Sequence, residues 1–297
     1  MGKKVTLIGL GLIASSIAHS LNELGSDIEL FGYDISKEVR KTAKKLGIIN
    51  VSDDIESVVK NSDLTIMCTP VGVIGSVVEQ ISPFLKNGSI LSDVGSVKKS
   101  VVKSVLPKLP QGITFIPAHP LAGTERSGPN AGFSGLFKNR WCILTPQKDT
   151  PELKLKVVKD FWESLGARVT EMTPEHHDLV LAVTSHAPHL IAYTMVGVAD
   201  DLANVTNSEV INFSAAGFRD FTRIAASDPT MWRDVFLNNK EAALEILGRF
   251  SEELFALNRA IRKGDGDFLY NYFSRTRSIR RSIVEAGQDT EQADFGR

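Results

Sequence analysis

A histidine that ends an apolar segment is the first side chain in this sequence that could take part in proton transfer. Residues 113–118 are mainly apolar, and His119 and Pro120 follow them directly. An imidazole titrates near neutral pH, so it can accept or donate a proton during a reaction. A lone His-Pro pair is more often a structural feature at a turn. The role of His119 therefore depends on what the rest of the chain places around it.

A glycine-rich turn near the N-terminus has the pattern of a dinucleotide-binding site. Gly9, Gly11 and Ala14 follow an apolar segment and open a helical one, which is the order strand, turn and helix. The first glycine permits a tight turn. The second lets the backbone approach a pyrophosphate, which the N-terminus of the next helix binds. Leu12 and Ile13, the first residues of that helix, are therefore predicted cofactor contacts.

An acidic residue ends the second predicted strand. Asp34 would accept hydrogen bonds from the adenosine ribose and repel a 2′-phosphate, so the sequence favours NAD, with NADP less favoured. Ligands of open α/β sheets bind at the carboxyl ends of the strands, so the other strand-end segments should line one crevice. Thr69 and Pro70 lie in the first of these and are predicted cofactor contacts. The segments are 68–72, 93–98 and 118–123.

Short β-rich segments alternate with helical ones up to about residue 172. Nearly continuous apolar strands separated by helices indicate a mainly parallel sheet covered on both faces. The predicted strands are 4–10, 27–34, 63–70, 88–95, 113–120, 141–146 and 167–173. The predicted helices are 12–25, 36–47, 71–85, 97–109 and 151–166.

The pattern after residue 174 is helical throughout. Residues 175–202 have a helical pattern that Pro188 should kink or break, 228–264 suggest one long helix, and 267–286 a further one. The fold class is thus α/β, with an N-terminal Rossmann-type domain over 1–173 and an all-α domain over 174–297.

The composition argues against nucleic acid and membranes as partners of this protein. The formal net charge is -1 and 42% of residues are hydrophobic, so no overall field favours nucleic acid or an anionic membrane. The apolar N-terminal stretch contains turn glycines and continues into a polar helix, which does not fit a signal peptide or a membrane span. Cys68 and Cys142 lie in apolar contexts, which favours reduced thiols and a cytoplasmic protein.

Five segments together resemble the prephenate/arogenate dehydrogenase family, and within it the bacterial cyclohexadienyl dehydrogenases. The resemblance extends over about residues 3 to 285. The most specific matches are the sequences HPLAGTERSG and FRDFTRIAASDP. The five segments are 9–18, 93–98, 118–128, 185–189 and 217–234.

The resemblance implies a fold and an activity. The fold would be a Rossmann domain followed by an all-α dimerisation domain, as in 6-phosphogluconate dehydrogenase, with a homodimer as the assembly. The activity would be the NAD-dependent oxidative decarboxylation of prephenate to 4-hydroxyphenylpyruvate, of L-arogenate to L-tyrosine, or both, in tyrosine biosynthesis. Hydride leaves C4 of the ring, a carbonyl develops there, and carbon dioxide departs as the ring becomes aromatic. No metal is required.

Site residues follow from the matching positions. His119 would bond the C4 hydroxyl and accept its proton, and Ser96 would help bind that hydroxyl. Arg223 is the candidate for a substrate carboxylate, since a guanidinium offers a bidentate fork, and Arg219 lies four residues earlier. The resemblance implies further substrate contacts at Ser185 and His189, and Trp232 could line the pocket or fill core.

Other polar residues receive structural interpretations. Lys98 could lie beside the cofactor or be solvated, and His176 and His177 are interpreted as a helix start without a role. Glu125 and Arg126 are expected to shape a loop over the pocket.

Two alternatives to the dehydrogenase remain. One is a 3-hydroxyacid-type NAD(P) dehydrogenase of similar architecture, which typically uses a lysine that the segment 185–189 does not supply. The other is a non-catalytic nucleotide sensor, which would be expected to have lost His119 or Arg223, and both are present.

Overall fold

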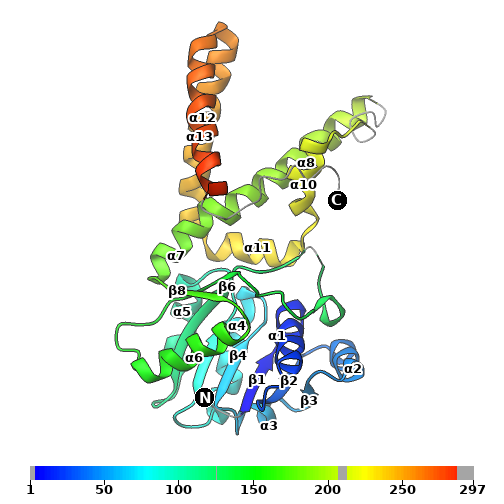
Figure 1. Ribbon diagram of the computed structural model, residues 1–297, viewed down its shortest axis with the longest axis vertical. Coiled ribbons are helices and arrows are strands. Elements are labelled where there is room, and N and C mark those ends of the chain that lie inside the picture. Colours follow the sequence, from blue (N-terminus) through cyan, green and yellow to red (C-terminus); the bar gives the residue numbers. More distant parts are fainter. Residues whose placement is uncertain (1–3, 125, 207–212, 286–297) are drawn as a thin grey trace. The chain divides into compact units, whose positions relative to one another are not determined.

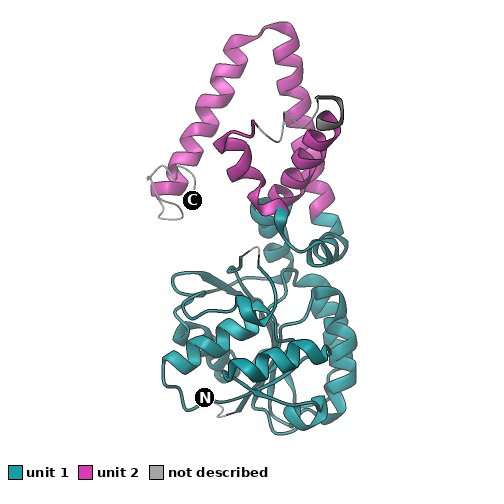
Figure 2. Ribbon diagram, turned by 90° about the vertical axis from the view of Figure 1, so that its right-hand side faces the viewer, with its two compact units in different colours: residues 1–186, 226–242 teal, residues 187–225, 243–297 magenta. Residues whose placement is uncertain are grey.

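The computed structural model describes residues 4–124, 126–206 and 213–285, with only the backbone of 203–206. The chain divides into two compact units (Figure 2). Unit 1 comprises residues 1–186 and 226–242, and unit 2 comprises 187–225 and 243–297. The predicted boundary after residue 173 stays a prediction.

Unit 1 contains an eight-stranded sheet of order β3-β2-β1-β4-β5-β6-β7-β8 (Figure 1). All neighbouring strands are parallel except β6 and β7, which confirms the predicted mainly parallel sheet. The order of the first six strands is that of dinucleotide-binding folds. The strands are β1 (Lys4–Ile8), β2 (Glu29–Tyr33), β3 (Asn50–Val51), β4 (Leu64–Met67), β5 (Ile90–Asp93), β6 (Thr114–Pro120), β7 (Trp141–Leu144) and β8 (Arg168–Glu171).

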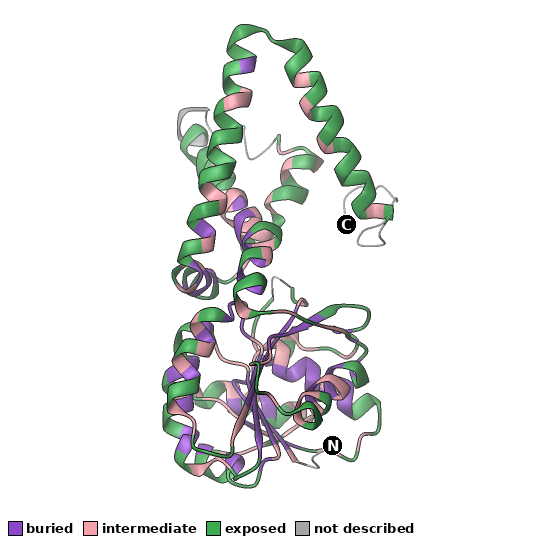
Figure 3. Cartoon of the chain, turned by 90° about the vertical axis from the view of Figure 1, so that its left-hand side faces the viewer, coloured by how far each residue is buried: buried purple, intermediate pink, exposed green. Residues whose placement is uncertain are grey.

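Helices lie on both faces of this sheet (Figure 3). One continuous core joins strand residues such as Leu7 to Ile17 of α1 and to Phe161 and Trp162 of α6. These side chains are at most 2% exposed, so the sheet is held by close apolar packing. The helices of unit 1 are α1 (Leu12–Glu23), α2 (Lys37–Leu46), α3 (Ile55–Val59), α4 (Val71–Ile81), α5 (Lys99–Val105), α6 (Glu152–Ser164), α7 (Pro174–Leu181) and α11 (Pro229–Asn238).

Local signals explain where several helices begin and end. The Ser36 hydroxyl accepts the N–H of Val39 at the start of α2, and Gly47 ends the helix with a φ of +68°. Thr173 caps α7 by accepting the N–H of His176, and Pro174 occupies the first helical position, which needs no N–H. The short elements β3 and α3 were not predicted because they carry too few residues to show a period.

The helix after β8 does not run unbroken. α7 passes into a π-helical turn at Ala182–His186, and α8 (Ala187–Thr206) follows. Pro188 has no N–H to bond the preceding turn, and the wider turn accommodates it. The predicted local break at Pro188 is therefore present one turn earlier, and the chain remains helical.

The prediction of one long helix over 228–264 is wrong. The structure has α11 and α12 (Lys240–Lys263), which are separated at Asn239. This residue has φ −113° and ψ 37°, and its side chain is buried. Its Nδ2 donates to the carbonyl of Asp178 and lies 3.1 Å from Nδ1 of His186. The polar contacts of the break are thus supplied by α7 and the π-helical turn.

The described residues of unit 2 form helices joined by short turns. It contains α8, α10 (Ala216–Thr222), a 3-10 turn at Arg223–Ala226, most of α12, and α13 (Gly266–Glu285). Gly264, with φ +68°, forms the turn between the last two helices. From this turn α12 and α13 diverge, and most of their surface is exposed (Figure 3).

One helical stretch of the described chain, Pro174–Leu202, is long and apolar enough to cross a membrane by length and composition alone. Core helices of soluble proteins meet the same criterion. Its first turns carry His177 and Asp178 into a buried polar cluster of unit 1, as a helix of a folded domain would. The absence of a membrane partner stays a prediction.

Candidate active site

The parallel strands of unit 1 bring the predicted site segments to one edge of the sheet. β1 ends at the glycine turn, β4 at Thr69 and Pro70, and β5 at the loop that contains Ser96. In the sheet register Asp93 pairs with Pro117, so β6 carries His119 just beyond the end of β5. The predicted crevice therefore has its residues on adjacent strand ends.

Gly9 must be a glycine for two reasons. Its φ is +93°, a conformation that other residues rarely adopt. A Cβ at this position would lie 2.8 Å from the carbonyl oxygen of Cys68, so the turn passes directly against the end of β4. Its N–H donates to the carbonyl of Tyr33. These contacts fix the turn between β1 and α1.

The N-terminus of α1 offers room for an anionic group. Gly11 is the N-cap and supplies no side-chain hydrogen bond, and a Cβ built on it would meet nothing within 4 Å. The first backbone N–H groups of a helix bind anions when no side chain caps them. Leu12 and Ile13 are half-buried beside this opening, and Ala14 is buried in the core. The residues present therefore fit a pyrophosphate.

Asp34 is held next to the glycine turn. One carboxylate oxygen accepts the N–H of Leu10 and the other accepts that of Ser36, each at 2.8 Å. A carboxylate oxygen can accept more than one hydrogen bond, so the group keeps acceptor capacity for ribose hydroxyls. The Arg40 guanidinium donates hydrogen bonds to the backbone carbonyl of Asp34 and to the carboxylate of Asp53.

His119 lies at the end of β6 and is only 8% exposed. Its Nδ1 is 2.9 Å from Nε2 of His177, which is fully buried on α7. Nδ1 of His177 is 2.8 Å from Oδ1 of Asp178. Two imidazoles and one carboxylate thus form a continuous hydrogen-bonded chain. The interpretation of His177 as a helix start without a role is incomplete, because its side chain contacts His119.

Asp178 is fixed by the start of a neighbouring helix. Its Oδ1 accepts the backbone N–H of Lys98 at 2.8 Å, and its Oδ2 accepts that of Lys99 at 2.9 Å. These N–H groups belong to the first turn of α5, where a carboxylate also interacts favourably with the helix dipole. Asp178 therefore caps α5 and bonds His177 at the same time.

Lys98 is not solvated. Its side chain is fully buried, and Nζ lies 2.5 Å from Oδ2 of Asp93 and 2.7 Å from the carbonyl oxygen of Ala118. The ion pair thus ties β5 to the residue directly before His119. Solvation was a reasonable expectation for a lysine in a loop, but the buried partner Asp93 compensates its charge.

Burial controls protonation in this cluster. It lowers the pKa of His119 well below the ordinary value of 6.5, and the positive charge of Lys98, or of His177 and His186 when they are protonated, acts in the same direction. Burial also lowers the pKa of His177, although the hydrogen bond to Asp178 opposes the shift. Both imidazoles are therefore neutral near pH 7. A neutral imidazole is the form that can accept a proton.

Three more of the predicted site residues belong to unit 1. Ser96 is half-buried in the loop after β5, and Ser185 is half-buried in the π-helical turn. Trp232 of α11 is 6% exposed, and its ring lies 6.0 Å from that of His186. Trp232 therefore packs against His186 in the π-helical turn.

Three predicted substrate residues belong to unit 2. His189 is half-buried on α8, Arg219 is exposed on α10, and Arg223 begins the 3-10 turn that follows α10. α8 and α10 pack against each other, so unit 2 carries these three residues on neighbouring elements. The structure does not place them relative to His119.

The remaining expectations concern the loop residues Glu125 and Arg126, a metal site and the two cysteines. Glu125, expected to shape the loop over the pocket, lies outside the described residues, and Arg126 is exposed beside it. Among the described residues, no group of three histidine, cysteine, aspartate or glutamate side chains has the arrangement of metal ligands. Cys68 and Cys142 are free thiols.

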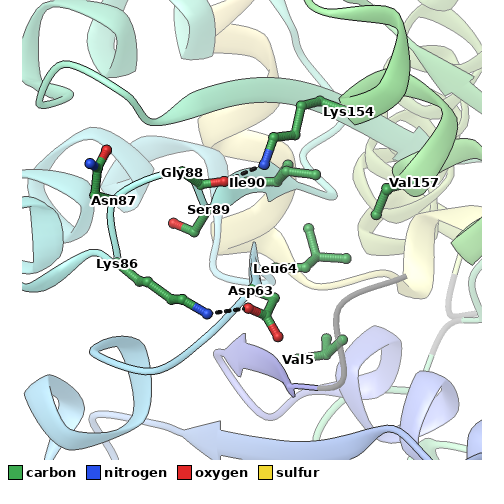
Figure 4. Close-up of a pocket in the computed structure, with 10 residues that line it drawn as sticks. All are labelled: Val5, Asp63, Leu64, Lys86, Asn87, Gly88, Ser89, Ile90, Lys154 and Val157. Atoms are coloured by element: carbon green, nitrogen blue, oxygen red, sulfur yellow. Dashed lines mark hydrogen bonds and ion pairs between the residues drawn. The ribbon is translucent and has the colours of Figure 1, made fainter.

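A surface pocket lies at the opposite edge of the sheet (Figure 4). It is lined by the amino ends of β1, β4 and β5 and by α6, where Lys86 pairs with Asp63 and Lys154 bonds the Gly88 carbonyl. Open α/β sheets bind ligands at the carboxyl ends of their strands. This pocket is therefore not the candidate site.

His177, Asp178 and the buried state of Lys98 were missed from the sequence. The available signal was a His-His-Asp run directly after the last strand, at a helix start that faces the sheet edge. Helical periodicity assigns such residues to a polar surface. It carries no information on their partners here, His119 and the first turn of α5, which are distant in sequence.

Comparisons with known proteins identify the family of this chain. Residues 17–171 match the model "Prephenate dehydrogenase, nucleotide-binding domain", and residues 173–275 match "Prephenate dehydrogenase, dimerization domain". The cyclohexadienyl dehydrogenase of Zymomonas mobilis is 42% identical over 95% of this chain and 96% of its own length. The prephenate dehydrogenase of Bacillus subtilis is 35% identical over 95% of this chain and 76% of its length.

Solved structures show the same fold. Prephenate dehydrogenase from Aquifex aeolicus, crystallised with hydroxyphenyl propionate and NAD+, aligns with a TM-score of 0.88 at 33% identity, over 95% of this chain and 99% of that one. Synechocystis arogenate dehydrogenase aligns with a TM-score of 0.78 at 26% identity, over 94% and 99%. The resemblance found in the sequence and the predicted fold class are confirmed, and the chain belongs to the prephenate dehydrogenase family.

Proposed function

We propose that the protein catalyses the NAD-dependent oxidative decarboxylation of prephenate, of L-arogenate, or of both, within tyrosine biosynthesis. The observation that carries this proposal is His119, a buried and neutral imidazole on the same sheet edge as the glycine turn. A hydride transfer needs a dinucleotide and a proton acceptor together, and this edge offers both.

The dinucleotide site is assigned to the residues predicted for it. The N-terminus of α1, with Gly11, Leu12 and Ile13, would hold the pyrophosphate, and Gly9 gives the turn its shape. Asp34 would accept the ribose hydroxyls, and its charge disfavours the 2′-phosphate of NADP. Thr69 and Pro70, after β4, would contact the cofactor at the next strand end.

Proton movement is assigned to His119. It accepts the proton of the C4 hydroxyl as a carbonyl forms at C4. NAD, when bound, supplies the acceptor for the hydride that leaves C4. The carbon–carbon bond to the ring carboxylate then breaks, and its electron pair makes the ring aromatic and places negative charge on the C4 oxygen. His119 returns the proton to this oxygen, so the residue ends the reaction neutral.

Substrate binding is assigned to the residues that the family resemblance implies. Ser96 would bond the C4 hydroxyl from the loop after β5, and Ser185, His189 and Trp232 would contact the substrate. Arg223, assisted by Arg219, would bind a carboxylate with its planar guanidinium. Substrate binding by these residues requires no metal ion.

The direct test is an assay of reduced cofactor. Purified protein is mixed with NAD and either prephenate or L-arogenate, and absorbance of the reduced nicotinamide is followed. We expect NAD to be reduced with at least one of the two substrates, and NADP to be reduced more slowly. No reduced cofactor with either substrate would contradict the proposal and would favour a non-catalytic nucleotide sensor, whereas reduction with a 3-hydroxy acid would favour the other alternative.

A homodimer in the cytoplasm completes the proposal. α12 and α13 diverge from their turn and leave large apolar side chains exposed, including Phe255 at 75% and Ile261 at 66%. A second copy of the same helical region would bury these residues, as its match to a dimerization domain suggests. Sedimentation at micromolar concentration should give a dimer, and a monomer would contradict this assembly.

A further inference from the structure

We propose that His177 and Asp178 are positioning residues that hold His119 in one tautomer, with the proton on Nδ1 and the lone pair on Nε2. The kinetic consequence rests on the proposed function, because it requires that His119 accept a proton from the substrate. The tautomer itself is a property of unit 1 and can be measured without substrate.

The hydrogen-bond directions start from Asp178. A carboxylate only accepts hydrogen bonds, so Nδ1 of His177, 2.8 Å away, must be the donor. A neutral His177 then has its lone pair on Nε2. That atom lies 2.9 Å from Nδ1 of His119, so His119 must donate from Nδ1. The hydrogen bond made by one ring nitrogen thus decides which form the other takes.

The geometry is well suited to fixing this arrangement. His177 is fully buried, and Asp178 is 4% exposed. Asp178 also accepts the first N–H groups of α5, and Asn239 anchors its backbone carbonyl. Neither partner can turn away without leaving buried polar groups unpaired, which is costly. The tautomer of His119 is therefore set by the fold before substrate binds.

The same hydrogen-bonded series of His119, His177 and Asp178 also stabilises the positive charge that His119 acquires on proton transfer. When His119 has accepted a proton on Nε2, its positive charge is shared through Nδ1–H with His177. The proton on Nδ1 can shift to Nε2 of His177, whose own Nδ1–H is bonded to the Asp178 carboxylate. Charge then moves toward the negative group, and both steps reverse when the proton returns to the product oxygen.

Nitrogen NMR tests the tautomer directly. The folded wild-type protein is labelled with 15N-histidine and examined without NAD or substrate near neutral pH. The His119 signals are identified by their absence in His119→Asn. We expect Nδ1 to resonate as a protonated nitrogen and Nε2 as an unprotonated one. The reverse pattern, or an equal mixture, would overturn the proposal whether or not the protein oxidises prephenate.

Paired variants test the kinetic consequence. His177→Phe removes the acceptor, whereas His177→Gln keeps an amide oxygen near the position of Nε2. His176→Phe, at the exposed neighbouring position, is the matched control. We expect kcat to fall about 100-fold in His177→Phe, within the usual contribution of acid–base catalysis. It should recover in part in His177→Gln and remain at the wild-type value in His176→Phe, with NAD affinity unchanged in all three.

The outcomes separate the two proposals. An inactive wild-type protein contradicts the proposed function and leaves the NMR result to decide the tautomer. An active wild-type protein with equal kcat in His177→Phe and His176→Phe overturns the positioning role. If His177→Phe does not fold, as shown by loss of NAD binding, then His177→Gln and the NMR pattern decide. A normal kcat in that variant together with a mixed tautomer would overturn the proposal.

Discussion

Removing the ammonium group of Lys98 should destabilise the protein strongly. Lys98 and Asp93 are both fully buried, and Nζ of the lysine lies 2.5 Å from the carboxylate. Lys98→Met keeps most of the side-chain volume but leaves a carboxylate without its counter-charge. It also removes the donor to the carbonyl of Ala118. Breaking one side of a buried ion pair costs about 3–5 kcal/mol, so the free energy of unfolding should fall by that amount.

The loss should depend on pH in a defined direction. Burial raises the pKa of Asp93, while Lys98 opposes this, so removing the lysine raises that pKa further. Lowering the pH then protonates the buried carboxyl in the folded variant before the carboxyl of the unfolded chain. The stability difference between Lys98→Met and wild type should therefore stay large above the raised pKa and shrink as the pH falls through it.

The assay is equilibrium unfolding in urea, followed by fluorescence of the buried Trp162 and by circular dichroism. Lys99→Met is the control, because Lys99 pairs with Glu241 at the exposed surface, where ion pairs contribute little. The double variant Asp93→Asn/Lys98→Met should recover part of the loss. Equal stability of Lys98→Met and Lys99→Met, or a loss that does not change with pH, would refute the reasoning.

Three further predictions concern the site. His119→Asn should lower kcat by about 10²–10⁴-fold with NAD affinity retained by calorimetry, and near wild-type turnover would remove its role. Arg223→Ala should raise KM for prephenate about 10- to 100-fold, since a charged hydrogen bond is lost, and an unchanged KM would exclude the contact. Wild type should lose stability below about pH 6.5, up to about 1.4 kcal/mol per pH unit for each of His119 and His177, because only their unfolded forms take up protons. His119→Asn should lose less, and equal loss in urea titrations would contradict this.

The sheet could be predicted because its signals are local. Each predicted strand of the N-terminal half is an apolar segment bounded by a turn, and the turn at Gly9 has both the spacing and the neighbours of a dinucleotide site. The position of His119 on the sheet edge followed from its place at the carboxyl end of a predicted parallel strand. The tight approach of Gly9 to Cys68 is the physical reason for the glycine.

The buried polar chain behind His119 could not be predicted, because its members are distant in sequence. His177 contacts a residue of β6 from a helix that begins after the last strand. Lys98 has the composition of a solvated loop residue and is buried only because Asp93 lies opposite. The break at Asn239 likewise depends on partners from α7 and the π-helical turn. No helical period contains such information.

A crystal structure with NAD and the phenolic product tests the central claim most directly. The phenol oxygen should lie about 2.6–3.2 Å from Nε2 of His119, within hydrogen-bonding distance, and the nicotinamide should lie against the ring at the former C4. A product oxygen directed away from this imidazole, with no bridging water, would contradict the assignment of proton transfer to His119.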